Sequence, residues 1–312
     1  MKQLIGTKKF YKKNSKKKIK IVIFGDLNNI ICRILTWELL KLSKKKIQVV
    51  KLFNTGKNSN LILNIIQFIL IKIFNIGNNN LIFNNTGFFL KYFSRLKIEN
   101  IKNINEKKFV ERIVKGNYKY AFSFCCNQIF KKKLISAFYK IVNYHSSILP
   151  KYRGLNSTLW SIFNNEKYTG FSYHYIDDKI DNGNIIFQKK FKINYNYSYK
   201  KIEIFKTLLA KNSIQKVLSL LLLNTSGTKQ KGSVSYYGKI NIKKLIIFRE
   251  ILDINKINKI IKIWGYIVFI KKNKKYFVTK ITDNGQILRI SHYPIFIYKI
   301  LKSIKTNIDI FK

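Results

Sequence analysis

The chain has 312 residues, and its 61 lysines and arginines against 14 aspartates and glutamates give a formal net charge of +47. With 46% hydrophobic and 15% aromatic residues, it is too apolar for a disordered tail and long enough for two domains. Two prolines and three cysteines exclude collagen-like, proline-rich and disulfide-stabilised proteins, and the spacing of Cys32, Cys125 and Cys126 matches no metal site.

Two apolar runs near the start of the chain predict a parallel sheet. Residues 19–24 (IKIVIF) and 48–53 (QVVKLF) are typical of buried strands. Between them, Asn28 or Asn29 caps a helix that we expect over residues 30–42. Strand, helix and strand at this spacing form a βαβ unit, which predicts an open, mostly parallel sheet.

The longest apolar stretch, residues 61–74, is predicted to be a buried helix rather than a membrane span. Polar residues interrupt it, and it is shorter than the ~20 residues that a span needs. Residues 75–87, rich in asparagine and glycine, predict a loop around one short strand. The basic extension over residues 1–18 lacks the apolar segment of a secretory signal. We therefore expect a cytoplasmic monomer without a membrane partner.

The rest of the chain divides into a larger and a smaller domain. We expect helices over residues 106–115, 132–138 and 199–223, and strands over residues 120–124, 141–144 and 188–195. The larger domain then covers residues 19–223, and residues 224–231 (NTSGTKQK) are the predicted linker. Residues 232–312 are predicted to be a small β-rich domain, because residues 269–283 alternate like a hairpin and residues 283–285 (DNG) are a turn signal.

Residue types that are rare in this chain gather between positions 143 and 183. Three of the seven aspartates and two of the three histidines lie there. On a strand from residue 141, Asn143 and His145 share one face. An amide beside an imidazole can polarise a carbonyl and move a proton, which acyl transfer requires. The alternative for His145 is a buried histidine satisfied by a hydrogen bond.

Two further elements of this segment are weak alone. Asp181 lies in a polar loop and could orient His145 or raise its pKa, although an Asp-x-Gly loop is usually only a turn. Arg153 could fix a substrate or a loop, and Gly154 permits a sharp bend. Their order and spacing make the combination informative.

Four motifs carry that order: NYHSSILPKYRG at 143–154, TG at 169–170, HYID at 174–177 and IDNGNII at 180–186. Together they resemble the formyltransferases that use 10-formyltetrahydrofolate. The resemblance implies an α/β fold with a Rossmann-like, mostly parallel sheet, helices on both faces and the folate in a cleft. It implies Asn143, His145 and Asp181 as the catalytic trio, with no metal.

The same resemblance assigns residues to the two substrates. Those implied to line the pterin pocket of the folate are Ser123, Cys125, Gln128, Ile176, Asp177 and Ile180. Those implied to bind the acceptor are Ser146, Leu149, Pro150, Arg153 and Gly154.

Within this family, the length and the small β-rich, OB-like C-terminal domain are similar to the methionyl-tRNA formyltransferases. The similarity implies initiator methionyl-tRNA as the partner. Lysines of the C-terminal domain would then contact tRNA phosphates, namely Lys243, Lys244, Lys256, Lys259, Lys262 and those at 271–275.

Departures from the tRNA enzymes keep two alternatives open. Residues 155–160 (LNSTLW) replace a proline-containing segment, and residues 51–60 lack an Arg-Gly-rich loop. Trp160 and His174 are more similar to enzymes acting on amino sugars, so an amino-sugar nucleotide or another small amine is the first alternative acceptor. The second alternative is an inactive relative that binds RNA through its charge. Genome drift toward A and T explains much of that charge, because the lysines accompany many isoleucines and asparagines.

Overall fold

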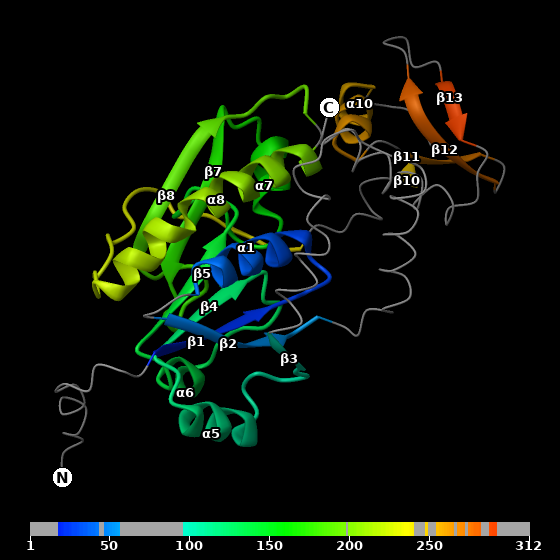
Figure 1. The fold of residues 1–312 in the computed structure, drawn as a ribbon. Coiled ribbons are helices and arrows are strands. Elements are labelled where there is room, and N and C mark those ends of the chain that lie inside the picture. The colour runs from blue at the N-terminus through cyan, green and yellow to red at the C-terminus, as the bar shows by residue number, and fades with distance from the viewer. Residues whose placement is uncertain are drawn as a thin grey trace, which may run out of the picture.

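The computed structural model describes residues 18–43, 47–56, 96–197, 199–239, 247–248, 254–264, 267–271, 274–281 and 287–291 (Figure 1). Several predicted features lie outside the described residues: the basic extension up to residue 17, the helix over 61–74, the loop over 75–87, the turn at 283–285, and Lys243 and Lys244 among the lysines predicted to contact tRNA.

A seven-stranded sheet with the order β3-β2-β1-β4-β5-β7-β8 forms the centre of the larger domain. In chain order the strands are β1 (Ile19–Gly25), β2 (Ile47–Asn54), β3 (Lys97–Asn100), β4 (Tyr120–Phe124), β5 (Lys140–His145), β7 (Tyr168–Tyr175) and β8 (Ile185–Lys192). The first five strands pair in parallel, whereas β7 runs antiparallel to both β5 and β8. The predicted mostly parallel sheet is confirmed.

Helices cover both faces of this sheet, as predicted. They are α1 (Ile30–Lys41), α5 (Lys107–Gly116), α6 (Lys132–Ile135), α7 (Ser157–Phe163) and α8 (Tyr199–Leu222). The side chains of β1 divide between the two faces with period two. Ile21 and Ile23 pack with residues of α1 and α8, whereas Val22 and Phe24 pack with residues of α5 and α6. Full burial of such a side chain contributes about 1.5–3 kcal/mol, so the central strand anchors both layers.

The boundaries of several elements differ from the predictions. Asn29 is the cap of α1, since its side chain accepts the N–H of Ile31. The short helix predicted over 132–138 ends at Ile135, because tight turns follow that carry Phe138 into the core. The strand predicted over 188–195 begins at Ile185, where it pairs with His174, and ends at Lys192. The strands β3 and β7 and the helix α7 were not predicted. Seven of the eight residues of β7 are buried, so β7 shows no alternation.

The described part of the C-terminal region is β-rich, as predicted. Its sheet has the order β10 (Ile247–Phe248), β11 (Ile267–Lys271), β12 (Lys274–Ile281) and β13 (Ile287–Ser291), with α10 (Ile254–Trp264) beside it. The predicted hairpin is the antiparallel pair of β11 and β12. The OB-like character of this region stays a prediction.

The residues that follow α8 run along the larger domain. Thr228 exchanges two backbone hydrogen bonds with Ile185, and β9 (Tyr236–Tyr237) pairs in parallel with β6 (Arg153–Gly154). We call residues 228–238 the strap. The predicted domain boundaries at 224–231 and 232 stay predictions, and the strap extends the contacts of the larger domain beyond them.

The described helices include none that is both long enough and apolar enough to cross a membrane.

Candidate active site

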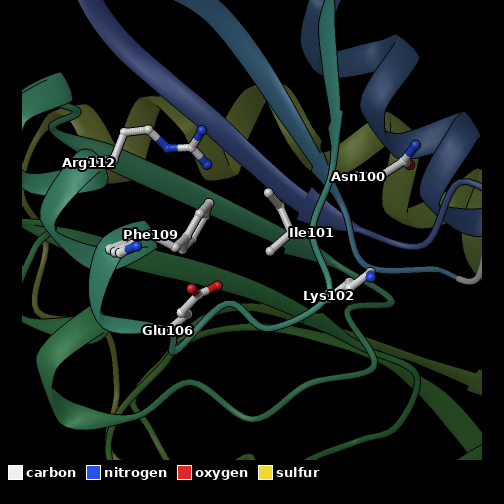
Figure 2. A pocket seen from close by; sticks show the side chains of 7 residues that line it. Asn100, Ile101, Lys102, Glu106, Phe109 and Arg112 are labelled. Atoms are coloured by element: carbon white, nitrogen blue, oxygen red, sulfur yellow. The ribbon is translucent and has the colours of Figure 1, made fainter.

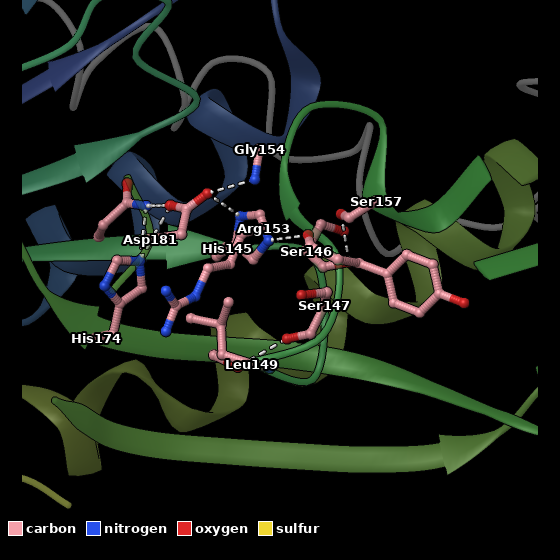
Figure 3. A network of polar contacts seen from close by, with 12 residues as sticks. His145, Ser146, Ser147, Leu149, Arg153, Gly154, Ser157, His174 and Asp181 are labelled. Atoms are coloured by element: carbon pink, nitrogen blue, oxygen red, sulfur yellow. Dashed lines mark hydrogen bonds and ion pairs between the residues drawn. The ribbon is translucent and has the colours of Figure 1, made fainter. Parts of the chain in front are cut away.

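At the carboxyl end of β5, Asn143 and His145 both contact Asp181 and so lie on one side of the sheet, as their spacing predicts. Figure 3 shows His145 and Asp181 within this network. The side chains between and after Asn143 and His145 face α8. Tyr144 lies in the core that α1 and α8 cover, and the Ser146 hydroxyl donates to Glu203 of α8 at 2.9 Å. One strand therefore serves both the site and the core.

Asp181 joins the two predicted catalytic side chains. Its Oδ1 accepts from Asn143 Nδ2 at 3.4 Å, its Oδ2 lies 3.4 Å from His145 Nδ1, and the N–H of Gly154 donates to Oδ2 at 2.8 Å. Burial favours a higher pKa for the Asp181 carboxyl, but the charge of His145 and the contacts of His174 and Gly154 outweigh it. The pKa of Asp181 is therefore held well below its usual range. Asp181 is a carboxylate at neutral pH.

The imidazole of His145 is held by one nitrogen and free to titrate at the other. Nε2 donates to the carbonyl of Tyr152 at 2.8 Å. A carbonyl only accepts, so Nε2 keeps its proton in both ionisation states and Nδ1, beside Asp181, is the atom that gains or loses one. Burial lowers the pKa of His145 and outweighs the opposing charge of Asp181. Asp181 does favour a higher pKa for His145, as expected. The expectation of a net rise in that pKa is wrong, because His145 is only 7% exposed and its burial has the larger effect.

Two glycines allow the loops to approach this closely. Asp181 has a left-handed φ of 49°, and a Cβ at Gly183 would lie 2.0 Å from the carbonyl oxygen of Tyr175. Gly154 has φ +92°, and a Cβ there would lie 2.4 Å from the carbonyl oxygen of Tyr237. Both positions therefore require glycine.

His174 orients Asn143, a role that the sequence did not assign. Its Nδ1 donates to the carbonyl of Tyr175 at 2.7 Å. Its Nε2 lies 3.1 Å from Asn143 Nδ2 and 3.4 Å from Asp181 Oδ1. His174 is 1% exposed and pairs with Asn143 across β5 and β7. Together His174 and Asp181 fix the direction of the Asn143 amide.

Gln230 of the strap links the two loops of the site, and sequence reasoning missed it too. Its Nε2 donates to the carbonyls of Asp181 and Gly183, both at 2.9 Å. Its Oε1 accepts from Arg153 at 2.7 Å, and Arg153 also donates to the Tyr236 hydroxyl. Arg153, implied to bind the acceptor, is 5% exposed and holds the strap. Gln230 lies in the predicted linker over residues 224–231, and its local sequence does not indicate that it binds the loops of the site.

Two other residues implied to bind the acceptor are engaged by protein groups. The N–H of Leu149 donates to Ser172 Oγ at 3.2 Å, and the carbonyl of Pro150 accepts from the N–H of Ser235 at 3.4 Å. These contacts shape the turn that leads to Tyr152. Direct contact of Ser146, Leu149 or Pro150 with a substrate stays a prediction.

The first of the two loops implied to bind the folate follows β4. Ser123 is buried at the end of that strand, and Cys125 has a left-handed φ of 55°. Burial raises the pKa of the Cys125 thiol well above its usual value, so this cysteine is not an activated nucleophile. The side chain of Gln128 accepts from the N–H of Ile104 and donates to the carbonyl of Lys102, which fixes the loop to the end of β3.

The second loop follows β7 and borders the first. The N–H of Ile176 donates to the carbonyl of Ile141 at 2.9 Å, Asp177 accepts from Asn182 at 2.7 Å, and Ile180 is 47% exposed. A hollow of about 450 Å³ lies beside α6, with Asp178 of this second loop on its wall, and it contains none of the predicted site residues. Its full lining is Asn105, Val110, Ile129, Phe130, Lys131, Lys132, Lys133, Leu134 and Asp178.

A further hollow, of about 460 Å³, lies at the carboxyl end of β3, where Ile101 and Phe109 stand among Glu106, Lys102 and Arg112 (Figure 2). It contains none of the predicted site residues. Within the described ranges, no group of histidine, cysteine, aspartate and glutamate side chains could hold a metal ion.

Comparison with known proteins gives a consistent result. Residues 85–215 match the family model described as formyl transferase. The chain is 37% identical over 101 residues to GDP-perosamine N-formyltransferase of Brucella melitensis, covering 31% of this chain and 38% of that protein. It is 26% identical over 187 residues to methionyl-tRNA formyltransferase of Buchnera aphidicola, covering 55% of this chain and 57% of that protein. The chain thus spans about two fifths to three fifths of these relatives.

The fold agrees with a solved structure. A sugar N-formyltransferase from Shewanella sp FDAARGOS_354 superposes with a TM-score of 0.58 at 18% identity, over 85% of this chain and 99% of that one. This likeness is one of fold.

Proposed function

We propose that this chain, whose residues 85–215 belong to the formyl transferase family, moves a formyl group from 10-formyltetrahydrofolate to a primary amine. The observation that carries the proposal is the constellation of Asn143, His145 and Asp181, joined by contacts of 3.4 Å around a buried carboxylate.

These side chains match the needs of formyl transfer. The folate supplies an activated formyl group. The Asn143 amide, oriented by His174, stabilises the negative charge that develops on the formyl oxygen. His145, neutral at rest because of burial, accepts at Nδ1 the proton of the attacking amine and returns it to the departing nitrogen. Asp181 stabilises the imidazolium in between.

The loops at 123–128 and 176–181 are suited to hold the folate. The hollow beside α6 is apolar at Val110, Ile129, Phe130 and Leu134, and its volume lies within the range of small-molecule sites. It borders the second loop at Asp178, and three lysines on its wall could bind a carboxylate-bearing tail: Lys131, Lys132 and Lys133. Deleting Asp178 or Ile180 side chains would test this placement through the KM for the folate.

Initiator methionyl-tRNA is the first candidate acceptor. The similarity to methionyl-tRNA formyltransferases extends over 55% of this chain, and the chain carries a basic C-terminal region. Lys259 is not among the lysines available to phosphates, because its Nζ donates to the carbonyl of Phe163 and to Asn165 Oδ1 at 2.9 and 2.7 Å. It joins α10 to the end of α7 instead.

An amino-sugar nucleotide is the second candidate. The similarity to GDP-perosamine N-formyltransferase is shorter but reaches 37% identity. Trp160 and Tyr237 add an aromatic surface beside the turn that holds His145, with ring centroids 4.8 Å apart. Aromatic rings of this kind stack on nucleobases.

The test is a transfer assay with labelled 10-formyltetrahydrofolate and two acceptors, initiator methionyl-tRNA and a nucleotide-linked 4-amino sugar. Formylation of tRNA supports the first candidate, and formylation of the sugar alone replaces it with the second. Asn143→Ala and His145→Ala are expected to abolish transfer to either acceptor. Transfer to neither, with RNA bound irrespective of sequence, would instead favour an inactive RNA-binding relative.

A further inference from the structure

Ser146, the residue after His145, is held by two opposite charges from one helix. Its hydroxyl donates to Glu203 at 2.9 and 3.1 Å, and its carbonyl accepts from Lys206 Nζ at 2.9 Å. Glu203 and Lys206 lie one turn apart on α8. We call these two residues the clamp.

The clamp is completed from α7. Lys206 Nζ also donates to Thr158 Oγ1 at 2.7 Å, and the Ser157 hydroxyl donates to the carbonyl of Ser146 at 2.8 Å. The carbonyl of Ser146 thus accepts from one charged and one neutral donor. These bonds fix the backbone next to His145, and the bond from His145 Nε2 to the carbonyl of Tyr152 fixes its ring.

Burying these charges is costly, so the clamp needs an explanation. Among the lysines that the structure describes, Lys206 is the one that is fully buried. Taking a charged group out of water costs several kcal/mol, and apolar replacements of buried ion pairs are often neutral or stabilising. Burial raises the pKa of Glu203, and it lowers the pKa of Lys206 to about 8 against the charge of Glu203. Packing alone is therefore a poor reason for this arrangement.

We propose that Glu203 and Lys206 are positioning residues that fix the backbone at His145 and so aim its imidazole for proton transfer. This role rests on the proposed formyl transfer. The clamp acts from the core face of β5, on the side opposite to the chemistry, and it contacts the hydroxyl and the carbonyl of Ser146, the residue that directly follows His145.

The clamp also acts through its charge. Burial lowers the pKa of His145, Asp181 raises it, and the positive charge of Lys206 lowers it to a smaller degree. The titratable groups around the clamp itself are Cys125 after β4, Tyr144 on β5 and Tyr199 on α8. Their own pKa values are raised by burial, which leaves them neutral, so Lys206 and Glu203 carry the charge on this side.

The decisive variant is Lys206→Met, which keeps the length of the side chain and removes the charge. We expect kcat to fall about tenfold with little change in KM, as for a misplaced catalytic group. We also expect the acid limb of the kcat/KM profile to move up by about half a pH unit, since a positive charge near His145 is gone. Lys206→Arg, which keeps the positive charge, should return the acid limb of the kcat/KM profile to its wild-type pH. Lys216→Met, at an exposed lysine of the same helix, is the matched control.

Two milder variants keep the test open if Lys206→Met does not fold. Glu203→Gln retains an acceptor for Ser146 without the charge, and Thr158→Val removes one partner of Lys206. Each is expected to lower kcat about threefold. Wild-type kcat and pH profile in both would overturn the proposal, because a purely structural clamp changes only the melting temperature.

A titration of the His145 ring by NMR separates this proposal from the proposed function, since it needs no substrate and the chain has only three histidines. If the wild type transfers no formyl group but the pKa of His145 rises in Lys206→Met, the function fails and the charge effect stands. If the wild type is active and Lys206→Met changes neither kcat nor the His145 pKa, the clamp is overturned.

Discussion

The two faces of β5 are built differently. On the face of Asn143 and His145, each polar side chain meets another polar side chain or a carbonyl at the edge of the sheet. On the face of Val142 and Tyr144, the strand packs into the core under α8, yet Ser146 ends that face with a buried, charged network. The end of a strand can therefore be held by contacts on its core side, while the side chains on its other side remain available for chemistry.

The sharpest way to test this contrast is to change one residue on each face. His145→Ala removes the proposed proton-transfer group, and we expect transfer to be abolished, with kcat at least about 10³-fold lower and a near-normal melting temperature. Val142→Ala leaves the site intact and should cost about 1–3 kcal/mol of stability through lost packing. Steady-state kinetics and thermal melts of both variants measure this. Equal kinetic losses in the two would contradict the division of roles.

Asp181→Asn tests the link between Asn143 and His145. The variant keeps the shape of the side chain but loses the carboxylate that stabilises the imidazolium. We expect kcat to fall by about 10²-fold with a smaller effect on KM. Glu111→Gln, at an exposed carboxylate of α5, is the control. An unchanged kcat in Asp181→Asn would remove Asp181 from the mechanism.

Gln230 tests whether the strap belongs to the site. Gln230→Glu keeps the size and the acceptor for Arg153 but loses the two N–H donors to the Asp181 loop. We expect kcat/KM to fall about tenfold, as a loosened loop displaces Asp181. Lys231→Gln, at an exposed neighbour, should behave as wild type. A wild-type kcat/KM in Gln230→Glu would show that the strap does not contribute to the site.

The smallest effect is expected in the pH dependence of stability. The pKa of Asp181 is lower in the folded than in the unfolded chain, so this carboxylate stabilises the fold above its unfolded pKa of ~3.9. That stabilisation is lost as the pH falls through the folded value. The melting temperatures of wild type and Asp181→Asn should therefore converge below about pH 4. A constant difference across the acid range would contradict the low pKa.

Much of the fold was predictable because its signals are local. The apolar run of β1, the Asn29 cap of α1 and the length of α8 follow from spacing and capping along the chain. β7 was missed because a strand buried on both faces has no alternation, and its pairing with β5 and β8 is what makes it a strand. The end of α6 depended on how Phe138 enters the core, which is a matter of packing.

The candidate catalytic side chains Asn143, His145 and Asp181 could be selected from the sequence alone. Asn143 and His145 share a face because strand side chains alternate, and the glycine of the Asp-x-Gly loop is required wherever that loop meets Tyr175. Only the tertiary structure decided how these groups are held. His174, Gln230 and Lys206 lie 31, 49 and 60 positions from the atoms that they bind. Such contacts leave no mark on local spacing, because they depend on which strands and helices pack together.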